Sequence, residues 1–332
     1  CSSDLDYYRE EMYFEIEFQE YMQFKFRQQW MKLKAYANEK GIQIIGDIPI
    51  YVAMDSADTW ANPWLFKLDE KNCPTQVAGC PPDGFSATGQ LWGNPLYNWE
   101  VHRNSGYEWW IKRIANCFRL YDVVRIDHFR GFDEYYAIPY GDATAENGWW
   151  EKGPGIDLFR AISASLGDRE IIAEDLGYMT DSVKRLVEES GYPNMKVIEF
   201  AFDERDTGNA SDYLPHNYPR NCVVYTGTHD NETLLSWLED ITPAERRQVR
   251  KYLNNFKDSG KELCDDLICL VMQSVANLCI VPMQDYLGLD NSARMNQPST
   301  LGKNWKWRLK EGQFTAELQK EMLELATRYG RR

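Results

Sequence analysis

Histidine and paired cysteines are both scarce in this sequence. Only four of its 332 residues are histidines, and no two of them stand in an H-x-H or H-x-x-x-H pattern. The eight cysteines include no C-x-x-C pair, and their spacing suggests neither a zinc site nor a disulfide framework. We therefore expect no metal site and no cofactor, and we expect reduced thiols, as in a cytoplasm.

Positive charge and long apolar runs are also in short supply. The 37 lysines and arginines stand against 51 aspartates and glutamates, and the formal net charge of −14 argues against nucleic acid and anionic membranes as partners. No apolar stretch is long enough to span a bilayer and no secretory signal opens the chain, so we expect a cytoplasmic protein. Neutral polar molecules remain possible substrates.

Aromatic residues, in contrast, are plentiful. They make up 14% of the chain, with 12 tryptophans and 20 tyrosines. Exposed rings suit carbohydrate, because sugar rings present apolar C–H faces. A tryptophan-rich core would explain the same composition, and both explanations can hold together.

An apolar run that ends in charged residues lies near the middle of the chain, with the sequence YDVVRIDHFRGF over residues 121–132. In an extended strand, alternation places Arg125 and Asp127 on one side, with Val124 and Ile126 on the other. A neighbouring cation keeps a carboxylate ionised and oriented, which suits a nucleophile. The alternative is a strand-end ion pair with only a structural role.

Two later apolar runs also end in acids. IIAEDLG ends in Glu174 and Asp175, and VVYTGTHDNET delivers His229 and Asp230. A parallel β/α barrel builds its active site from the carboxyl ends of several strands. Two carboxylates that flank a bond are the minimum for glycoside chemistry.

Strand and helix patterns alternate along the chain after an opening helix over residues 4–40, which predicts an α/β fold with a parallel sheet. We expect a (β/α)8 TIM barrel in which strands three to eight are present. A closed barrel needs eight strands, so we expect that the first two βα units are absent or supplied by another chain. The six expected strands lie near residues 44, 124, 172, 198, 224 and 280.

We treat residues 1–332 as one catalytic domain with insertions at about 53–100 and 135–156. The first insertion has little periodicity, so we expect a long active-site loop there rather than regular structure. We expect the strand near residue 198 to cover Lys196–Phe202.

Six stretches of the chain together resemble a known family. They read GDIPIYVAMDSAD, PPDGFSATGQLWGNPLYNW, DVVRIDHFRGF, IIAEDLG, TGTHDNET and ARMNQP…NWKWR. From about Trp30 to the C-terminus, the sequence is similar to the 4-α-glucanotransferases (amylomaltases or disproportionating enzymes), relatives of the α-amylases. It departs from the family pattern in the spacers of the last stretch and in Gly84, which follows PPD.

This resemblance implies transfer of α-1,4-glucan segments from a maltooligosaccharide donor to the 4-hydroxyl of an acceptor sugar, by a retaining double displacement. It implies that Asp127 is the nucleophile and that Glu174 is the acid and base. Asp230 would hold ring hydroxyls of the distorted sugar. A retaining pair lies roughly 5–5.5 Å apart, and its acid needs a raised pKa.

The resemblance also implies substrate-binding positions around these acids. Arg125 would orient Asp127, and His229 would bind a sugar hydroxyl. A loop over residues 81–97 would exclude water and so favour transfer over hydrolysis. The remaining implied binding residues are Asp83, Gln90, Trp92, His128, Asp175 and Asn296. Trp92 could instead pack within the loop, and His128 could be a satisfied strand-end histidine.

Three alternatives remain open from the sequence. A metal-dependent hydrolase could use Asp127, His128, His229 and Asp230 as ligands. A retaining, amylase-like glucan hydrolase would use the same acids. A non-catalytic glucan-binding fragment is the third. With maltotriose, a transferase gives glucose plus longer chains, a hydrolase gives only shorter sugars, and a binding module gives neither.

Overall fold

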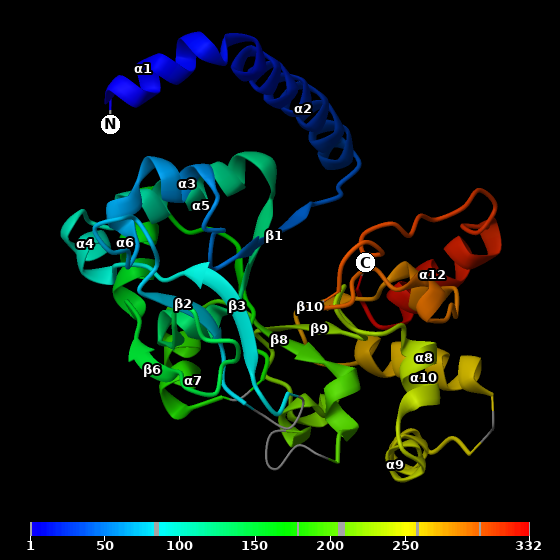
Figure 1. The fold of residues 1–332 in the computed structure, drawn as a ribbon. Helices are drawn as coiled ribbons and strands as arrows, with labels where there is room; N and C mark the ends of the chain where they lie inside the picture. Colours follow the sequence, from blue (N-terminus) through cyan, green and yellow to red (C-terminus); the bar gives the residue numbers. More distant parts are fainter. Residues whose placement is uncertain are drawn as a thin grey trace.

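The computed structural model describes residues 2–82, 86–177, 179–204, 210–256, 259–298 and 300–331. Its main element is a parallel sheet of six strands in the order β1-β4-β7-β8-β9-β10 (Figure 1). The strands are β1 (Ile45–Pro49), β4 (Val123–Asp127), β7 (Ile171–Ala173), β8 (Asn194–Val197), β9 (Cys222–Tyr225) and β10 (Leu278–Ile280). Each of these six strands pairs in parallel with the one that follows it in this order, as in a β/α barrel. This topology confirms the predicted fold class.

The sheet does not close on itself. Within the described part of the chain, β1 pairs only with β4 and β10 pairs only with β9, so these two strands are the edges. The arrangement is therefore an open part of a barrel, as the count of six strands predicted.

Strand β4 shows how the sequence sets the two faces of the sheet. Val124 and Ile126 point outward and are fully buried in a core shared with covering helices. Val123 points inward and packs with Ile172 and Met195 of the neighbouring strands. Arg125 and Asp127 share the inward face because side chains alternate along a strand.

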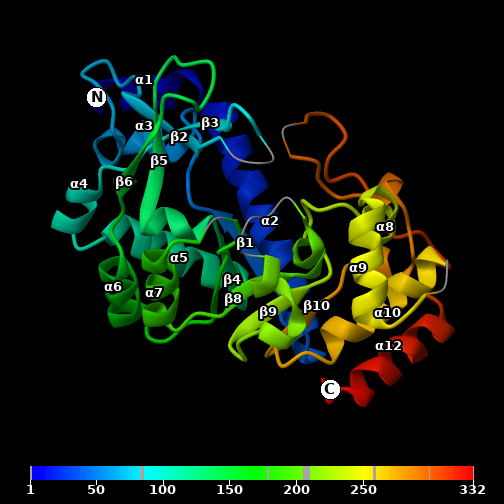
Figure 2. The same ribbon diagram turned by 90° about the horizontal axis from the view of Figure 1, so that it is seen from below.

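Two groups of helices cover the outer face of this sheet. Figure 2 shows α5, α6 and α7 on one side of the strands and α8, α9, α10 and α12 on the other. Each group has its own apolar core. The helices are α1 (Ser2–Glu11), α2 (Tyr13–Glu39), α3 (Ala57–Ala61), α4 (Trp99–Asn104), α5 (Glu108–Leu120), α6 (Ile156–Leu166), α7 (Asp181–Ser190), α8 (Leu234–Asp240), α9 (Pro243–Leu253), α10 (Gly260–Met272), α11 (Met283–Tyr286) and α12 (Ala316–Arg328).

Short 3-10 helices join several of these elements, and one of them corrects a sequence prediction. The strand expected over Lys196–Phe202 ends at Val197, and residues Ile198–Phe202 form a 3-10 helix. Ile198, Ala201 and Phe202 all enter the same core, a spacing that suits a helical turn and not a strand. The other 3-10 helices are Pro63–Leu65, Phe129–Phe132, Ala210–Tyr213, Pro215–Asn217 and Asn291–Ala293.

The two insertions fold together into a second, antiparallel sheet. In the first insertion we had expected a long active-site loop without regular structure. Its strands, in the order β3-β2-β5-β6, are β2 (Gln76–Cys80), β3 (Gln90–Pro95), β5 (Glu134–Pro139) and β6 (Trp149–Lys152). The register between β2 and β3 shifts between Val77 and Gly79. A Cβ on Gly79 would lie 2.2 Å from the carbonyl oxygen of Gln90, so only glycine allows this close approach.

The predicted opening helix is confirmed, with a break at Met12 between α1 and α2. Figure 1 shows both helices reaching away from β1. Many aromatic residues of these helices lie on the surface: α2 has no buried residue, and Phe14 is 78% exposed. Trp30 anchors the C-terminal half of α2, because its Nε1 donates to the carbonyl of Leu120 at 2.8 Å. Among the described residues, no helix combines the length and the apolar character needed to cross a membrane.

Candidate active site

An arginine joins two acids at the carboxyl end of the parallel sheet. β1 and β4 pair in a register that sets Asp47 beside Arg125 and Pro49 beside Asp127. Arg125 Nη1 donates to both carboxylate oxygens of Asp47 at 2.7 Å, and its Nη2 donates to Asp127 Oδ1 at 3.0 Å. Arg125 is buried, so these charge-assisted bonds fix the carboxylate of Asp127 in one orientation.

The pKa of Asp127 differs from the simple expectation of a carboxylate beside a cation. Burial raises the pKa of Asp127, Arg125 lowers it, and the nearby charge of Asp47 raises it again, with a net rise from 3.8. The side chain is nevertheless 44% exposed, and the guanidinium of Arg125 contacts it directly. Arg125 therefore favours the charged form of Asp127, although burial and the charge of Asp47 outweigh its effect on the pKa.

Glu174 comes directly after β7, the strand that pairs with β4. Since Ile126 pairs with Ala173, the next residues, Asp127 and Glu174, follow on adjacent strands. Glu174 accepts hydrogen bonds from the backbone N–H of His128 at 2.6 Å and of Leu176 at 2.8 Å. Burial, together with the charge of Asp127, raises the pKa of Glu174 from 4.5 to about 7. Glu174 is therefore the member of the pair that holds a proton near neutrality.

The third acid comes from the loop after β9. His229 and Asp230 are adjacent there, with His229 Nε2 3.4 Å from Asp230 Oδ2 and 3.9 Å from Asp47 Oδ2. Asn296 Nδ2 donates to the other oxygen of Asp230, Oδ1, at 2.5 Å. The structure thus brings Asp47, Arg125, His229 and Asp230 into one connected group.

Two predicted residues of the first insertion, Trp92 and Gln90, lie near His128, the residue after Asp127. Trp92 lies on β3, not in a loop, and its ring packs edge-on against the His128 ring at 4.8 Å. Gln90 is exposed and accepts a hydrogen bond from Trp92 Nε1 at 3.0 Å. His128 Nε2 is buried without a hydrogen-bond partner among the described residues, and burial lowers the pKa of His128 to about 3.

Two further predicted binding residues are Asp175 and Asp83. Asp175 is buried and accepts hydrogen bonds from Met195 N at 3.0 Å and Asn194 Nδ2 at 3.2 Å, so it holds the start of β8. Its sugar contact stays a prediction. Asp83 lies outside the described residues.

Sequence reasoning missed Asp47 as a site residue. The stretch IQIIGDIPIYV shows an acid within an apolar strand, which is the same signal that drew attention to Asp127. The barrel prediction makes the strands near residues 44 and 124 neighbours, but it does not set their register, and the register is what places Asp47 beside Arg125.

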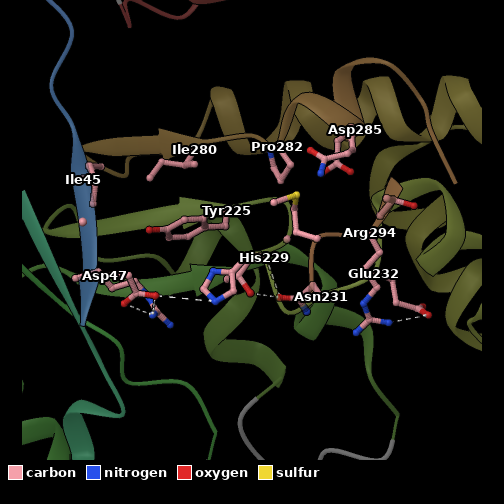
Figure 3. Close-up of a pocket in the computed structure, with 17 residues that line it drawn as sticks. Ile45, Asp47, Tyr225, His229, Asn231, Glu232, Ile280, Pro282, Asp285 and Arg294 are labelled. Atoms are coloured by element: carbon pink, nitrogen blue, oxygen red, sulfur yellow. Dashed lines mark hydrogen bonds and ion pairs between the residues drawn. The ribbon is translucent and has the colours of Figure 1, made fainter. Parts of the chain in front are cut away.

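A cavity of about 450 Å³ adjoins the group of charged residues. Figure 3 shows Ile45 on one side of it, Ile280 and Pro282 on another, and Asp47 and His229 along one wall. It occupies the space between the edge strands β1 and β10, while Asp127 and Glu174 do not line it. Within the described ranges, no group of three or more histidine, cysteine or acidic side chains is arranged to hold a metal ion.

The fold and site define a class of protein. Paired carboxylates at the carboxyl edge of a β/α barrel, one of them protonated near neutrality, are the arrangement that glycoside chemistry uses. A model of the 4-alpha-glucanotransferase family, glycoside hydrolase family 77, matches residues 2–315.

Known relatives agree with this match. The chain is 50% identical over 331 residues to a 4-alpha-glucanotransferase of Streptococcus pneumoniae, covering 99% of this chain and 65% of that protein. It is 48% identical to a 4-alpha-glucanotransferase of Clostridium butyricum, covering 99% of this chain and 67% of that protein. The amylomaltase of Streptococcus agalactiae, solved in complex with acarbose, superposes with a TM-score of 0.94 at 42% identity, covering 100% of this chain and 66% of that chain. The chain therefore belongs to the 4-alpha-glucanotransferase family, and it spans about two-thirds of the length of these relatives.

Proposed function

We propose that this chain carries the acids of a 4-α-glucanotransferase, which moves α-1,4-glucan segments from a maltooligosaccharide donor to the 4-hydroxyl of an acceptor sugar. One observation carries the proposal: Glu174, whose pKa is raised to about 7, lies on the strand next to Asp127, which accepts a hydrogen bond from Arg125 at 3.0 Å. Adjacent strands lie about 4.8 Å apart, close to the separation that a retaining pair of carboxylates needs.

In the first step, an Asp127 oxygen attacks C1 of the donor sugar while the bond from C1 to the 4-oxygen of the next sugar breaks. Glu174 gives its proton to that 4-oxygen, so the leaving chain departs with a hydroxyl group. The product is a β-linked ester between Asp127 and the remaining glucan. Asp230 and His229 bind ring hydroxyls and favour the flattened, oxocarbenium-like sugar of the transition state.

In the second step, the ionised Glu174 takes the proton from the 4-hydroxyl of an acceptor sugar. The resulting oxygen attacks C1, the ester bond to Asp127 breaks, and an α-1,4 link forms again. Water would give hydrolysis instead, so transfer requires that an acceptor sugar compete with water. We assign that role to the region around Trp92, which packs against His128 next to the nucleophile.

The proposal extends to partners and location. Maltooligosaccharides and α-1,4-glucans are the proposed ligands, and the acarbose complex of the Streptococcus agalactiae amylomaltase supports this choice. The seven cysteines that the structure describes are all free, which supports a reducing compartment such as the cytoplasm.

Product analysis after incubation of the chain with maltotriose tests the proposal. We expect glucose together with chains longer than maltotriose, and we expect Asp127→Asn to lower the rate by at least about 10³-fold. Asp181→Asn, an exposed aspartate at the start of α7, is the matched control and should react like the unaltered chain. Glucose and maltose alone would show a hydrolase, and no reaction would favour a glucan-binding fragment; either outcome would reject transfer.

A further inference from the structure

The segment Arg294–Asn296, which follows β10 and α11, lies directly against the loop that carries His229 and Asp230. The backbone N–H of Asn296 donates to the carbonyl of His229 at 3.0 Å, and Arg294 Nη2 donates to the carbonyl of Asp230 at 2.6 Å. The side chain of Asn296 donates to Asp230 Oδ1 at 2.5 Å. Backbone and carboxylate of Asp230 are therefore both held from this segment.

The guanidinium of Arg294 makes a contact through each of its three nitrogen atoms. Besides the carbonyl of Asp230, it contacts the carbonyl of Asn296 through Nε at 2.9 Å and Glu232 Oε1 through Nη1 at 3.6 Å. Glu232 Oε1 also accepts from Asn291 Nδ2 at 3.0 Å. Figure 3 shows Arg294 and Glu232 joined beside the cavity, in line with Asn231 and His229.

The burial of Arg294 increases the strength of these contacts. Its side chain is 19% exposed and that of Glu232 is 29% exposed, so water screens the charge only partly. Hydrogen bonds from a charged donor are stronger than neutral ones, and more so away from solvent. A planar guanidinium can bond two carbonyls at once, which a lysine ammonium of similar length does less well.

The loop after β9 fixes its own turn by hydrogen bonds within residues 228–231. Asn231 Oδ1 accepts from Thr228 N at 2.9 Å and from Thr228 Oγ1 at 2.7 Å, and Thr228 Oγ1 accepts from Asp230 N at 3.3 Å. Neighbours of Asp230 also contact other parts of the chain, since the His229 ring packs against Trp305 at 5.1 Å. Among the described residues, the hydrogen bonds that tie Asp230 itself to another part of the chain come from Arg294 and Asn296.

We propose that Arg294 is a positioning residue for Asp230. Arg294 donates hydrogen bonds to the carbonyls of both Asp230 and Asn296, and so fixes the position of Asn296 relative to the loop. The Asn296 side chain can then donate to Asp230 Oδ1. The other oxygen, Oδ2, then lies beside His229 and is the one offered to sugar hydroxyls. This inference rests on the proposed function, in which Asp230 acts in the transition state.

The inference predicts a specific kinetic pattern in the maltotriose transfer assay. Arg294→Gln should lower kcat about 10- to 100-fold with KM changed less than about 3-fold, because a small displacement of a transition-state group affects kcat. Arg294→Lys keeps the charge without the planar guanidinium, so its kcat should lie between that of the unaltered chain and that of Arg294→Gln. Arg169→Gln is the control, since exposed Arg169 also donates through Nε to a backbone carbonyl, that of Leu166 at 3.0 Å, before the start of β7. It should leave kcat unchanged.

A double-mutant cycle separates positioning from general stabilisation. If Arg294 acts through Asp230, adding Arg294→Gln to Asp230→Asn should lower kcat less than about 2-fold further. Fully additive losses, a change confined to KM, or an unchanged kcat would overturn the inference. Should the unaltered chain show no transfer, the proposed function fails, and a crystal structure of Arg294→Gln then decides the inference alone. An Asp230 carboxylate displaced by more than about 1 Å supports it, and an unmoved carboxylate overturns it.

Discussion

The unusual protonation of Glu174 has a measurable effect on stability. Burial, reinforced by Asp127, raises the pKa of Glu174 from 4.5 to about 7 in the folded chain. Glu174 is 9% exposed, so solvent does little to screen this effect. A shift of this size corresponds to about 3 kcal/mol of free energy of unfolding.

The sign follows from which state holds the proton. Below pH 4.5, both the folded and the unfolded chain carry a protonated Glu174, and the shift contributes nothing. Between pH 4.5 and about 7, the unfolded chain has released the proton while the folded chain still holds it. The folded state therefore loses stability as the pH rises through this window, and the loss is complete above about pH 7.

Replacing Glu174 with glutamine removes this dependence. Relative to the unaltered chain, Glu174→Gln should gain up to about 3 kcal/mol of stability between pH 4 and pH 8. Loss of one of the two backbone hydrogen bonds to Glu174 adds an offset that does not change with pH. Urea unfolding followed by circular dichroism at several pH values measures the difference. Glu321→Gln, an exposed glutamate on α12, is the control and should follow the unaltered chain. Parallel pH profiles for Glu174→Gln and the unaltered chain would refute the reasoning.

Two further predictions concern the reaction. The value of kcat/KM for maltotriose transfer should fall as the pH rises through about 7, because Glu174 must be protonated to release the leaving sugar; a flat profile up to pH 9 would contradict its role as the acid. Trp92→Ala should increase hydrolysis relative to transfer, since it opens the region beside His128 to water; the ratio of free glucose to lengthened chains measures this, with the exposed Trp64→Ala as control, and an unchanged ratio would count against the role of Trp92.

The parallel sheet was predictable mainly from β4, β7 and β9, which are short, β-branched runs buried on both faces. In such strands local composition and tertiary environment agree, as Val123–Asp127 shows. The same alternation rule correctly placed Arg125 and Asp127 on one face. Helix starts were also readable: Thr180 caps α7, and Thr242 with Glu245 forms a capping box before Pro243.

The antiparallel sheet was not predictable from local pattern. Strand β2 reads QVAGC and β3 reads QLWGNP, without alternation and with glycine in both. Strand β2 is specified by pairing with β5, which lies far along the chain, and β3 is specified by pairing with β2, with the close approach at Gly79. The sequence signals that would mark a strand are therefore replaced by contacts that only the fold creates.

The same distinction applies to the site. Asp127 ends β4, Glu174 follows β7 and Asp230 lies in the loop after β9, so a local signal at the end of an apolar strand marked all three as candidates. Arg294 follows no such strand and became visible only through its contacts with the loop of Asp230. For Asp175, the family resemblance implied a binding role, and the structure adds hydrogen bonds from Met195 and Asn194.

The double contact of Arg125 has a consequence for how the site responds to disturbance. Asp47 lies on β1, whereas Arg125 and Asp127 both lie on β4, so the guanidinium ties the nucleophile to a neighbouring strand as well as to its own. A change on β1 that withdrew Asp47 from Arg125 would free the guanidinium to turn away from Asp127. The alignment of the nucleophile therefore depends on a residue that never touches it.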